Sequence, residues 1–349
     1  MNLLHGKNNP LSRAFATAAA IAILAVAPAA IDSSARAEGK GLDVEIPFQI
    51  EALKTTGLVA PYYVQPMGDH MIVSDQAGGI YTVNFDGKTT PVPGAAKIKY
   101  PAGIAIAPDG FGKYAGEIFV LSAAGGDKSP CEVERIDASG KVSVFAQLPD
   151  AKSGPATACR DLEFGPAGSP YAGKLYAATS GNSTIYEIDP SGNVNFFGTY
   201  QDPMPFELTT IGFTPASDPK APNSMLVGMH LQMGSAAKVG RISIVGPDGK
   251  MGDVYQIGFI RPAGFAWSPD NFGTYPHEFF IAETGKFSSE NKGFRDGLIA
   301  RVEKGSPRTW ATGLMDPSDM KFIGGKMVIC DPAERGVGGG AIVIISSMM

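Results

Sequence analysis

The chain has 349 residues, a formal net charge of −5 at pH 7, 44 glycines and 27 prolines. A mildly acidic chain without a basic run lacks the positive surface that binds nucleic acid or anionic lipid, which argues against both as partners. The length and the glycine and proline content fit one large all-β domain as well as two smaller domains.

Residues 1–37 have the pattern of a secretory signal peptide. Lys7 and Arg13 form a basic head, residues 14–30 are an alanine-rich apolar run, and an A-x-A cleavage pattern ends at Ala37. An uncleaved membrane anchor is the alternative, but the run is short for a span and a cleavage pattern follows it. No later apolar run is long enough to cross a bilayer. We therefore predict a periplasmic or secreted protein with no membrane span after processing.

Six segments of similar length and apolar pattern recur in the remaining chain, residues 38–349. They are residues 70–75, 117–122, 174–179, 224–229, 278–283 and 326–331. Each follows one short strand-like segment and precedes another, and most of the third segments run into a turn such as Asp-Pro-Ser-Gly at 189–192. In that turn Pro190 sets φ, and Gly192 takes the position where a side chain would be penalised.

Units of four short strands at a spacing of 49 to 58 residues are the signature of a β-propeller. The last unit ends at residues 341–349 without a fourth strand, whereas residues 42–50 form a strand-like segment without a partner. Pairing the two would close the ring and remove an exposed edge. We predict an all-β, single-domain, six-bladed β-propeller over residues 38–349, closed by the N-terminal strand in the last blade.

Three cysteines remain in the mature chain, namely Cys131, Cys159 and Cys330. An exported chain folds in an oxidising compartment, so one disulfide and one leftover thiol are expected. The repeat places Cys131 at the start of a third strand and Cys159 before the next first strand, on the same face of adjacent blades. We predict a Cys131–Cys159 disulfide and a buried free thiol at Cys330, which lies within an apolar strand.

The six-unit pattern resembles the propellers of the NHL-repeat and SMP-30/gluconolactonase/strictosidine-synthase-like superfamily. The segments that carry the resemblance are residues 101–110, 173–194 and 261–270, and it covers residues 42–346. The resemblance implies the architecture. It leaves the chemistry open, because this fold hosts lactonases, esterases, lyases and binding modules.

Three acids share one repeat position, the end of the second strand: Asp75, Glu283 and Asp331. Their blades become neighbours once the ring closes, and the loops that follow this position vary most in length, so this looped face is the expected ligand site. Ca²⁺ or another divalent cation, which prefers oxygen ligands, would relieve the repulsion between converging carboxylates. The alternative is that each carboxylate accepts backbone N–H bonds from its own loop.

The resemblance also implies that lactonases of the family hold a catalytic divalent metal with Glu, Asn and Asp at the starts of innermost strands. The corresponding positions here carry no acid or amide. They are Ala60, Ala102, Arg160, Thr209, Ala263 and Ser318.

Arg160 and His230 are the candidate catalytic residues. A guanidinium at the start of an innermost strand could clamp a carboxylate or phosphate, although Arg160 could instead pair with Asp161, Glu163 or a neighbouring blade. His230 follows a second strand and could be a general base or a ligand, or it could serve packing alone.

Two functions fit the sequence. The leading interpretation is an exported, SMP-30/gluconolactonase-like hydrolase of lactones or esters, with a divalent cation near Asp75, Glu283 and Asp331 polarising a carbonyl. The alternative is a non-catalytic periplasmic propeller that binds a small molecule or a protein through its looped face. Six-bladed propellers also carry the quinone cofactor PQQ, but no residue in the sequence argues for a quinoprotein dehydrogenase.

Overall fold

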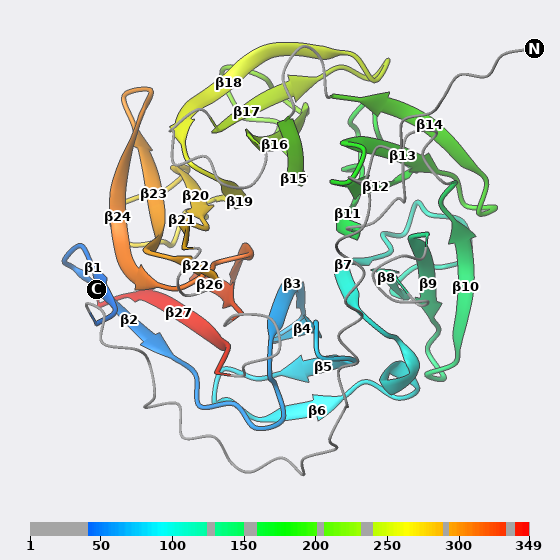
Figure 1. Ribbon diagram of the computed structural model, residues 1–349, viewed down its shortest axis with the longest axis horizontal. Helices are drawn as coiled ribbons and strands as arrows, with labels where there is room; N and C mark the ends of the chain where they lie inside the picture. Colours follow the sequence, from blue (N-terminus) through cyan, green and yellow to red (C-terminus); the bar gives the residue numbers. More distant parts are fainter. Residues whose placement is uncertain are drawn as a thin grey trace, which may run out of the picture. The chain divides into compact units, whose positions relative to one another are not determined.

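The computed structural model describes residues 41–348 apart from 124–129, 150–158, 201–205, 232–239, 289–292 and 333–338. The described residues form six antiparallel sheets arranged in a ring (Figure 1). This confirms the predicted all-β, six-bladed β-propeller, and the one helical element among these residues is the 3-10 turn η1, Ala95–Lys97. The predicted signal peptide, residues 1–37, lies outside the described residues.

Every blade runs from an innermost strand at the ring axis to an outer strand at the rim. In order of blades one to six, the innermost strands are β3 (Pro61–Met67), β7 (Pro101–Ile106), β11 (Cys159–Phe164), β15 (Phe206–Phe213), β19 (Pro262–Trp267) and β25 (Asp319–Ile323). The second strands are β4 (His70–Asp75), β8 (Ile118–Ser122), β12 (Leu175–Thr179), β16 (Met225–Leu231), β20 (Phe279–Glu283) and β26 (Lys326–Asp331). These second strands coincide, within two residues at either end, with the six recurring segments of the sequence.

The two outer layers follow the same order. The third strands are β5 (Ile80–Val83), β9 (Glu132–Ile136), β13 (Thr184–Ile188), β17 (Gly240–Val245), β23 (Gly297–Glu303) and β27 (Ala341–Ser347). The fourth strands are β6 (Thr89–Pro91), β10 (Val142–Gln147), β14 (Val194–Thr199), β18 (Met251–Phe259), β24 (Ser306–Leu314) and β2 (Phe48–Ala52). A hairpin of β21 (Lys286–Ser288) and β22 (Gly293–Arg295) follows the second strand of blade five.

The N-terminal segment closes the ring, as predicted, and it contacts two blades. Strand β2 pairs with the last strand β27, from Phe48 opposite Ser347 to Ala52 opposite Val343, and so completes blade six. Before it, the two-residue strand β1 (Asp43–Val44) adds a fifth strand to blade five by pairing with β24. The start of the described chain therefore ties blade five to blade six.

The core lies between neighbouring blades, because both faces of each inner strand pack against another blade. At the closure, Phe48 of β2 has its ring centroid 4.9 Å from that of Phe272 and 5.1 Å from that of Trp310. Phe280 joins the same buried cluster. Such aromatic contacts add to the free energy gained from burying the rings.

The predicted Cys131–Cys159 disulfide is formed, with the two Cα atoms 5.7 Å apart, and it joins blade two to blade three. Cys330 is buried with a free thiol, also as predicted. Among the described residues, no helix has the length and apolar character needed to span a bilayer.

We expect Phe48→Ala to lower the free energy of unfolding by about 3 to 5 kcal/mol, because it opens a cavity where the ring is closed. Chemical denaturation measures the loss. Phe196→Ala is the matched control, since Phe196 on the outer strand of blade three is 66% exposed. Equal effects of the two substitutions would contradict the role given to β2.

Candidate functional site

The pairing between the innermost and second strands is irregular at one end of the ring. In blades one to five the register shifts near the first residues of the innermost strand, for example between Pro61 and Tyr63 and between Pro262 and Gly264. Such bulges turn a side chain away from the regular alternation. They lie at the end where the second strands finish, which is the looped face singled out in the sequence.

Polar side chains from five of the six blades gather at this end of the innermost strands. We call them the axial cluster: Tyr62, Arg160, Glu207, His230, Arg261 and Asp316. Tyr62, His230 and Arg261 are buried, and Arg160, Glu207 and Asp316 are half-buried.

Arg160 reaches from blade three to blade one. Its Nη1 donates to the hydroxyl of Tyr62 at 2.6 Å, and its Nε donates to the hydroxyl of Ser180 at 3.0 Å. Blade two, which lies between them, has the small Ala102 at the position that follows its first paired residue. Within the described residues Arg160 makes no ion pair with Asp161 or Glu163, which was the alternative considered from the sequence.

His230 and Glu207 form a pair on blade four. They stand opposite each other in the β15–β16 register, with 3.3 Å between His230 Nε2 and Glu207 Oε2. The contact with His230 lowers the pKa of Glu207, against the burial that would raise it. The pair gives this end of the ring a carboxylate that orients an imidazole.

Arg261 and Asp316 come from blades five and six. Burial lowers the pKa of Arg261, and the nearby positive charge of Arg160 lowers it further. Burial raises the pKa of Asp316 to about 6, although the positive charge of Arg261 opposes this shift. The two arginines are thus close enough to repel each other, and Asp316 changes charge in the neutral range.

The three carboxylates that were predicted to bind a metal accept hydrogen bonds from backbone N–H groups instead. Both oxygens of Asp75 are occupied: Oδ2 accepts from the N–H of Val59 at 2.6 Å, and Oδ1 accepts from Ala60 at 3.0 Å and Ala77 at 2.8 Å. Ala77 lies in the loop that follows Asp75, as in the alternative considered from the sequence, whereas Val59 and Ala60 lie in the segment before the innermost strand.

The other two acids behave in the same way. Asp331 accepts from the N–H groups of Met315 at 3.0 Å and Asp316 at 2.7 Å, and Glu283 accepts from Ile260 at 3.2 Å. No three His, Cys, Asp or Glu residues within the described ranges are grouped so that they could hold a metal ion. The three side chains therefore do not fit a divalent cation in this arrangement.

Each of these acids instead fixes the segment that leads into the innermost strand of its own blade. Asp331 holds the backbone of Asp316 itself, and Glu283 holds the residue before Arg261. Asp75 holds Ala60, two residues before Tyr62. The acids thus position three members of the axial cluster.

A second polar group crosses the ring deeper along the innermost strands. Lys321 of blade six forms an ion pair with Glu163 of blade three at 2.7 Å, and Gln65 of blade one donates to the same carboxylate at 3.2 Å. Asp319 accepts from the backbone of blade one, and Asp161 accepts from the backbone of blade four. Burial, followed by the charge of Glu163, raises the pKa of Asp161 to about 7. We interpret this group as a brace between opposite blades.

The sequence found two of the six cluster residues, Arg160 and His230. In blade one the residue after the first paired position is Tyr62, not Ala60 as expected from the repeat. Glu207, Arg261 and Asp316 were missed because they stand two residues before Thr209, Ala263 and Ser318, the positions that the repeat indicated. Shifting the alignment by two residues would have placed all three in a single column.

No protein-family model and no curated protein matches the sequence, but many solved structures share the fold. A gluconolactonase from Xanthomonas campestris superposes with a TM-score of 0.57 at 11% identity, covering 87% of this chain and 90% of that one. The aldose sugar dehydrogenase of Escherichia coli gives 0.55 at 12% identity, covering 86% and 99%. The PQQ-bound aldose sugar dehydrogenase of Streptomyces coelicolor gives 0.53 at 13%, covering 87% and 99%. At these identities the likeness establishes the propeller fold alone.

We expect Asp316 to titrate with a pKa of about 6, which ¹³C NMR of its carboxyl carbon would measure. Arg261→Gln should raise this pKa further, because it removes the nearest opposing positive charge. Lys250→Gln, which removes an exposed charge paired with Asp248, is the control and should leave it unchanged. An ordinary Asp316 pKa near 4 in the wild type would refute the geometry described for this pair.

Proposed function

We propose that the axial cluster binds the carboxylate of a small organic anion. The observation that carries the proposal is the environment of Arg160, whose hydrogen-bond partners are the hydroxyls of Tyr62 and Ser180. A guanidinium held by neutral hydroxyls keeps its positive charge for a ligand, and its planar donors suit a carboxylate. Its Nη2 makes no hydrogen bond within the described residues.

The charges of the cluster support a single negative group. Arg160 and Arg261 face Glu207 and Asp316, and Glu207 is engaged by His230. When Asp316 is protonated, the balance becomes positive and favours an anion. A ligand carboxylate between the two arginines would also relieve their mutual repulsion.

The disulfide and the pattern of residues 1–37 support a site of action outside the cytoplasm. The looped face, where the cluster lies, would then meet small molecules of the periplasm or the medium. Binding of the anion does not require a divalent cation at Asp75 and Asp331, because their oxygens accept hydrogen bonds from backbone N–H groups.

Titration calorimetry with gluconate, citrate and PQQ, compared with the neutral triamide of citrate, tests the proposal. We expect at least one of the acids to bind and the triamide to bind far more weakly. Arg160→Gln and Arg261→Gln should each weaken binding by roughly 10- to 100-fold, the effect of losing a charged hydrogen bond of about 1.5 to 3 kcal/mol. Affinity should rise as the pH falls from 7 to 5, because Asp316 loses its negative charge through about pH 6.

Arg135→Gln is the matched control for these two variants, because Arg135 pairs with Glu117 on blade two at 3.2 Å and is not part of the axial cluster. Binding that is equally weakened by all three substitutions, or by none, would contradict the proposed site. So would the absence of any binding by the acids.

The His230–Glu207 pair favours a second candidate, a hydrolase of lactones or esters. The imidazole, oriented by the carboxylate, would take a proton from water as the oxygen attacks the ester carbonyl carbon. The oxyanion would face the arginines. Collapse would break the bond to the alcohol oxygen, which would take the proton back from His230, leaving a carboxylic acid and an alcohol.

A panel of aryl esters and glucono-lactone tests this second candidate. If the protein is a hydrolase, His230→Gln should lower kcat by roughly 10²- to 10⁴-fold, the usual contribution of a general base, while gluconate affinity stays within a few fold. Absence of wild-type turnover would eliminate the hydrolase and leave the binding function. A rate that is lost on chelation and restored by Ca²⁺ would instead support the divalent-cation mechanism predicted from the sequence.

A further inference from the structure

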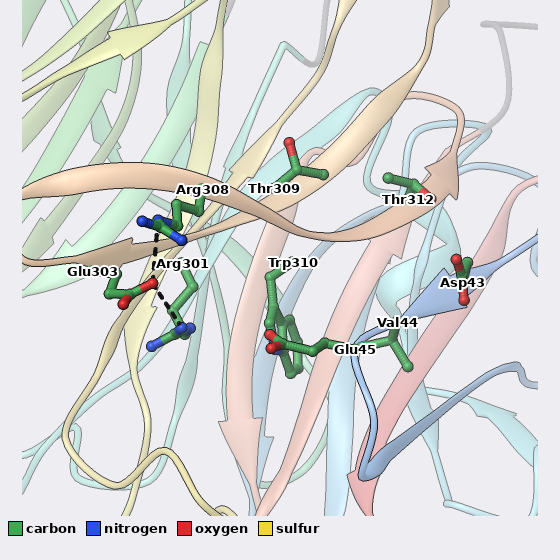
Figure 2. Close-up of a pocket in the computed structure, with 9 residues that line it drawn as sticks. All are labelled: Asp43, Val44, Glu45, Arg301, Glu303, Arg308, Thr309, Trp310 and Thr312. Carbon is green, nitrogen blue, oxygen red and sulfur yellow. Dashed lines mark hydrogen bonds and ion pairs between the residues drawn. The ribbon is translucent and has the colours of Figure 1, made fainter.

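A cavity of about 370 Å³ lies at the outer edge of blade five, between the N-terminal strand β1 and the outer strands β23 and β24. Figure 2 shows its side chains, with Arg301, Glu303 and Arg308 on one side and Glu45 on the other. The cavity is formed at the rim of the blade, whereas the axial cluster lies at the start of the innermost strands. It is therefore a separate site, and nothing in the proposed function uses it.

We propose that this cavity binds a neutral, polyhydroxylated ligand of the carbohydrate type. Its volume falls within the range of small-molecule sites, roughly 300 to 1,000 Å³. The two arginines supply hydrogen-bond donors, and Asp43, Glu45 and Glu303 supply acceptors. Hydroxyl groups, which both donate and accept, match such a mixed lining.

Arg301 is fixed in place before any ligand arrives. Its guanidinium carbon lies 4.1 Å from the centre of the Tyr275 ring, and its nitrogens lie 3.4 Å from Glu303 and 3.8 Å from Glu278. Arg308 shares Glu303 at 3.2 Å but is 69% exposed, so it can meet a ligand with little loss of contacts. Figure 2 shows both guanidinium groups meeting the one Glu303 carboxylate.

Trp310 provides the observation that calls for a ligand atom. The residue is only 4% exposed, and its indole Nε1 has no acceptor among the described residues. Its ring is held by Phe48 and Phe280, with centroids 5.1 and 4.8 Å away, so it cannot easily turn to find a partner. In Figure 2 the Trp310 ring and the end of the Glu45 side chain overlap in the view. Trp310 lines the cavity, and a ligand oxygen that reached its N–H group through a small shift of the lining would satisfy a donor that is costly to leave unpaired.

The charge of the lining favours a neutral ligand over an anion. Glu303 contacts both guanidinium groups, and the three carboxylates of the lining outnumber its two arginines. The remaining carboxylates, Asp43 and Glu45, would repel a negative group brought beside them. This separates the rim cavity from the axial cluster, where we expect an anion.

The test uses the mature chain with Trp267→Phe, which leaves Trp310 as the single tryptophan of the two. Glucose, maltose and cellobiose are titrated while Trp310 fluorescence is recorded. We expect a saturable change with at least one of these sugars and none with glucuronate or citrate. In calorimetry on the otherwise wild-type chain, Arg308→Gln and Trp310→Phe should each weaken binding of that sugar at least fivefold.

Trp310→Phe keeps an aromatic ring in place and removes the indole N–H group. Lys88→Gln, on the exposed outer hairpin of blade one, is the control for Arg308→Gln, because it also removes one positive charge. A denaturation midpoint within error of the wild type confirms that each variant is folded. No saturable response to any neutral sugar overturns the proposal. A stronger response to glucuronate or citrate, or sugar binding unchanged by both cavity variants, overturns it as well.

Discussion

Buried carboxylates that accept hydrogen bonds from backbone N–H groups fix the position of the segments at the axial end of this propeller. Asp75, Glu283 and Asp331 stand at one repeat position and hold the segments that enter the innermost strands of their own blades. Because a buried charge is stable only when it is well hydrogen-bonded, these contacts fix both the acid and the backbone it holds. The side chains of Arg261 and Asp316 take their places from that backbone. A repeated structural contact thus positions the non-repeated polar groups of the axial cluster.

One contact between innermost strands occurs twice around the ring, three blades apart. Gly103 of blade two lies against Asp161 of blade three, and Gly264 of blade five lies against Asp319 of blade six. A Cβ atom on either glycine would come within 3.0 Å of the backbone of the facing aspartate's strand, so only glycine fits there. Each aspartate then holds the backbone of the next blade, and Lys321 crosses between the two halves. The six blades therefore act at the axis as two sets of three.

The sequence predicted what repeats and missed what does not. The strand at 70–75, the closure by the N-terminal segment and the Cys131–Cys159 disulfide follow from local pattern and blade order, and all three were predicted. The closing strand was expected at residues 42–50 and is Phe48–Ala52. The contact between Arg160 and Tyr62 could not be predicted, because it spans a whole blade and depends on the small side chain between them. The acids at the ends of the second strands were recognised as a set, but a shared position does not tell whether the oxygens face one another or the backbone.

The cavity at the rim of blade five has one wall from β1 and another from β24. These walls come from opposite ends of the described chain, and they meet where the N-terminal segment packs on the last two blades. A ligand bound between these walls would bind the closed propeller and not one whose N-terminal segment had detached. Ligand binding would therefore shift the equilibrium toward the closed ring by mass action. The bound ligand would then stabilise the propeller at the contact where the two ends of the chain close the ring.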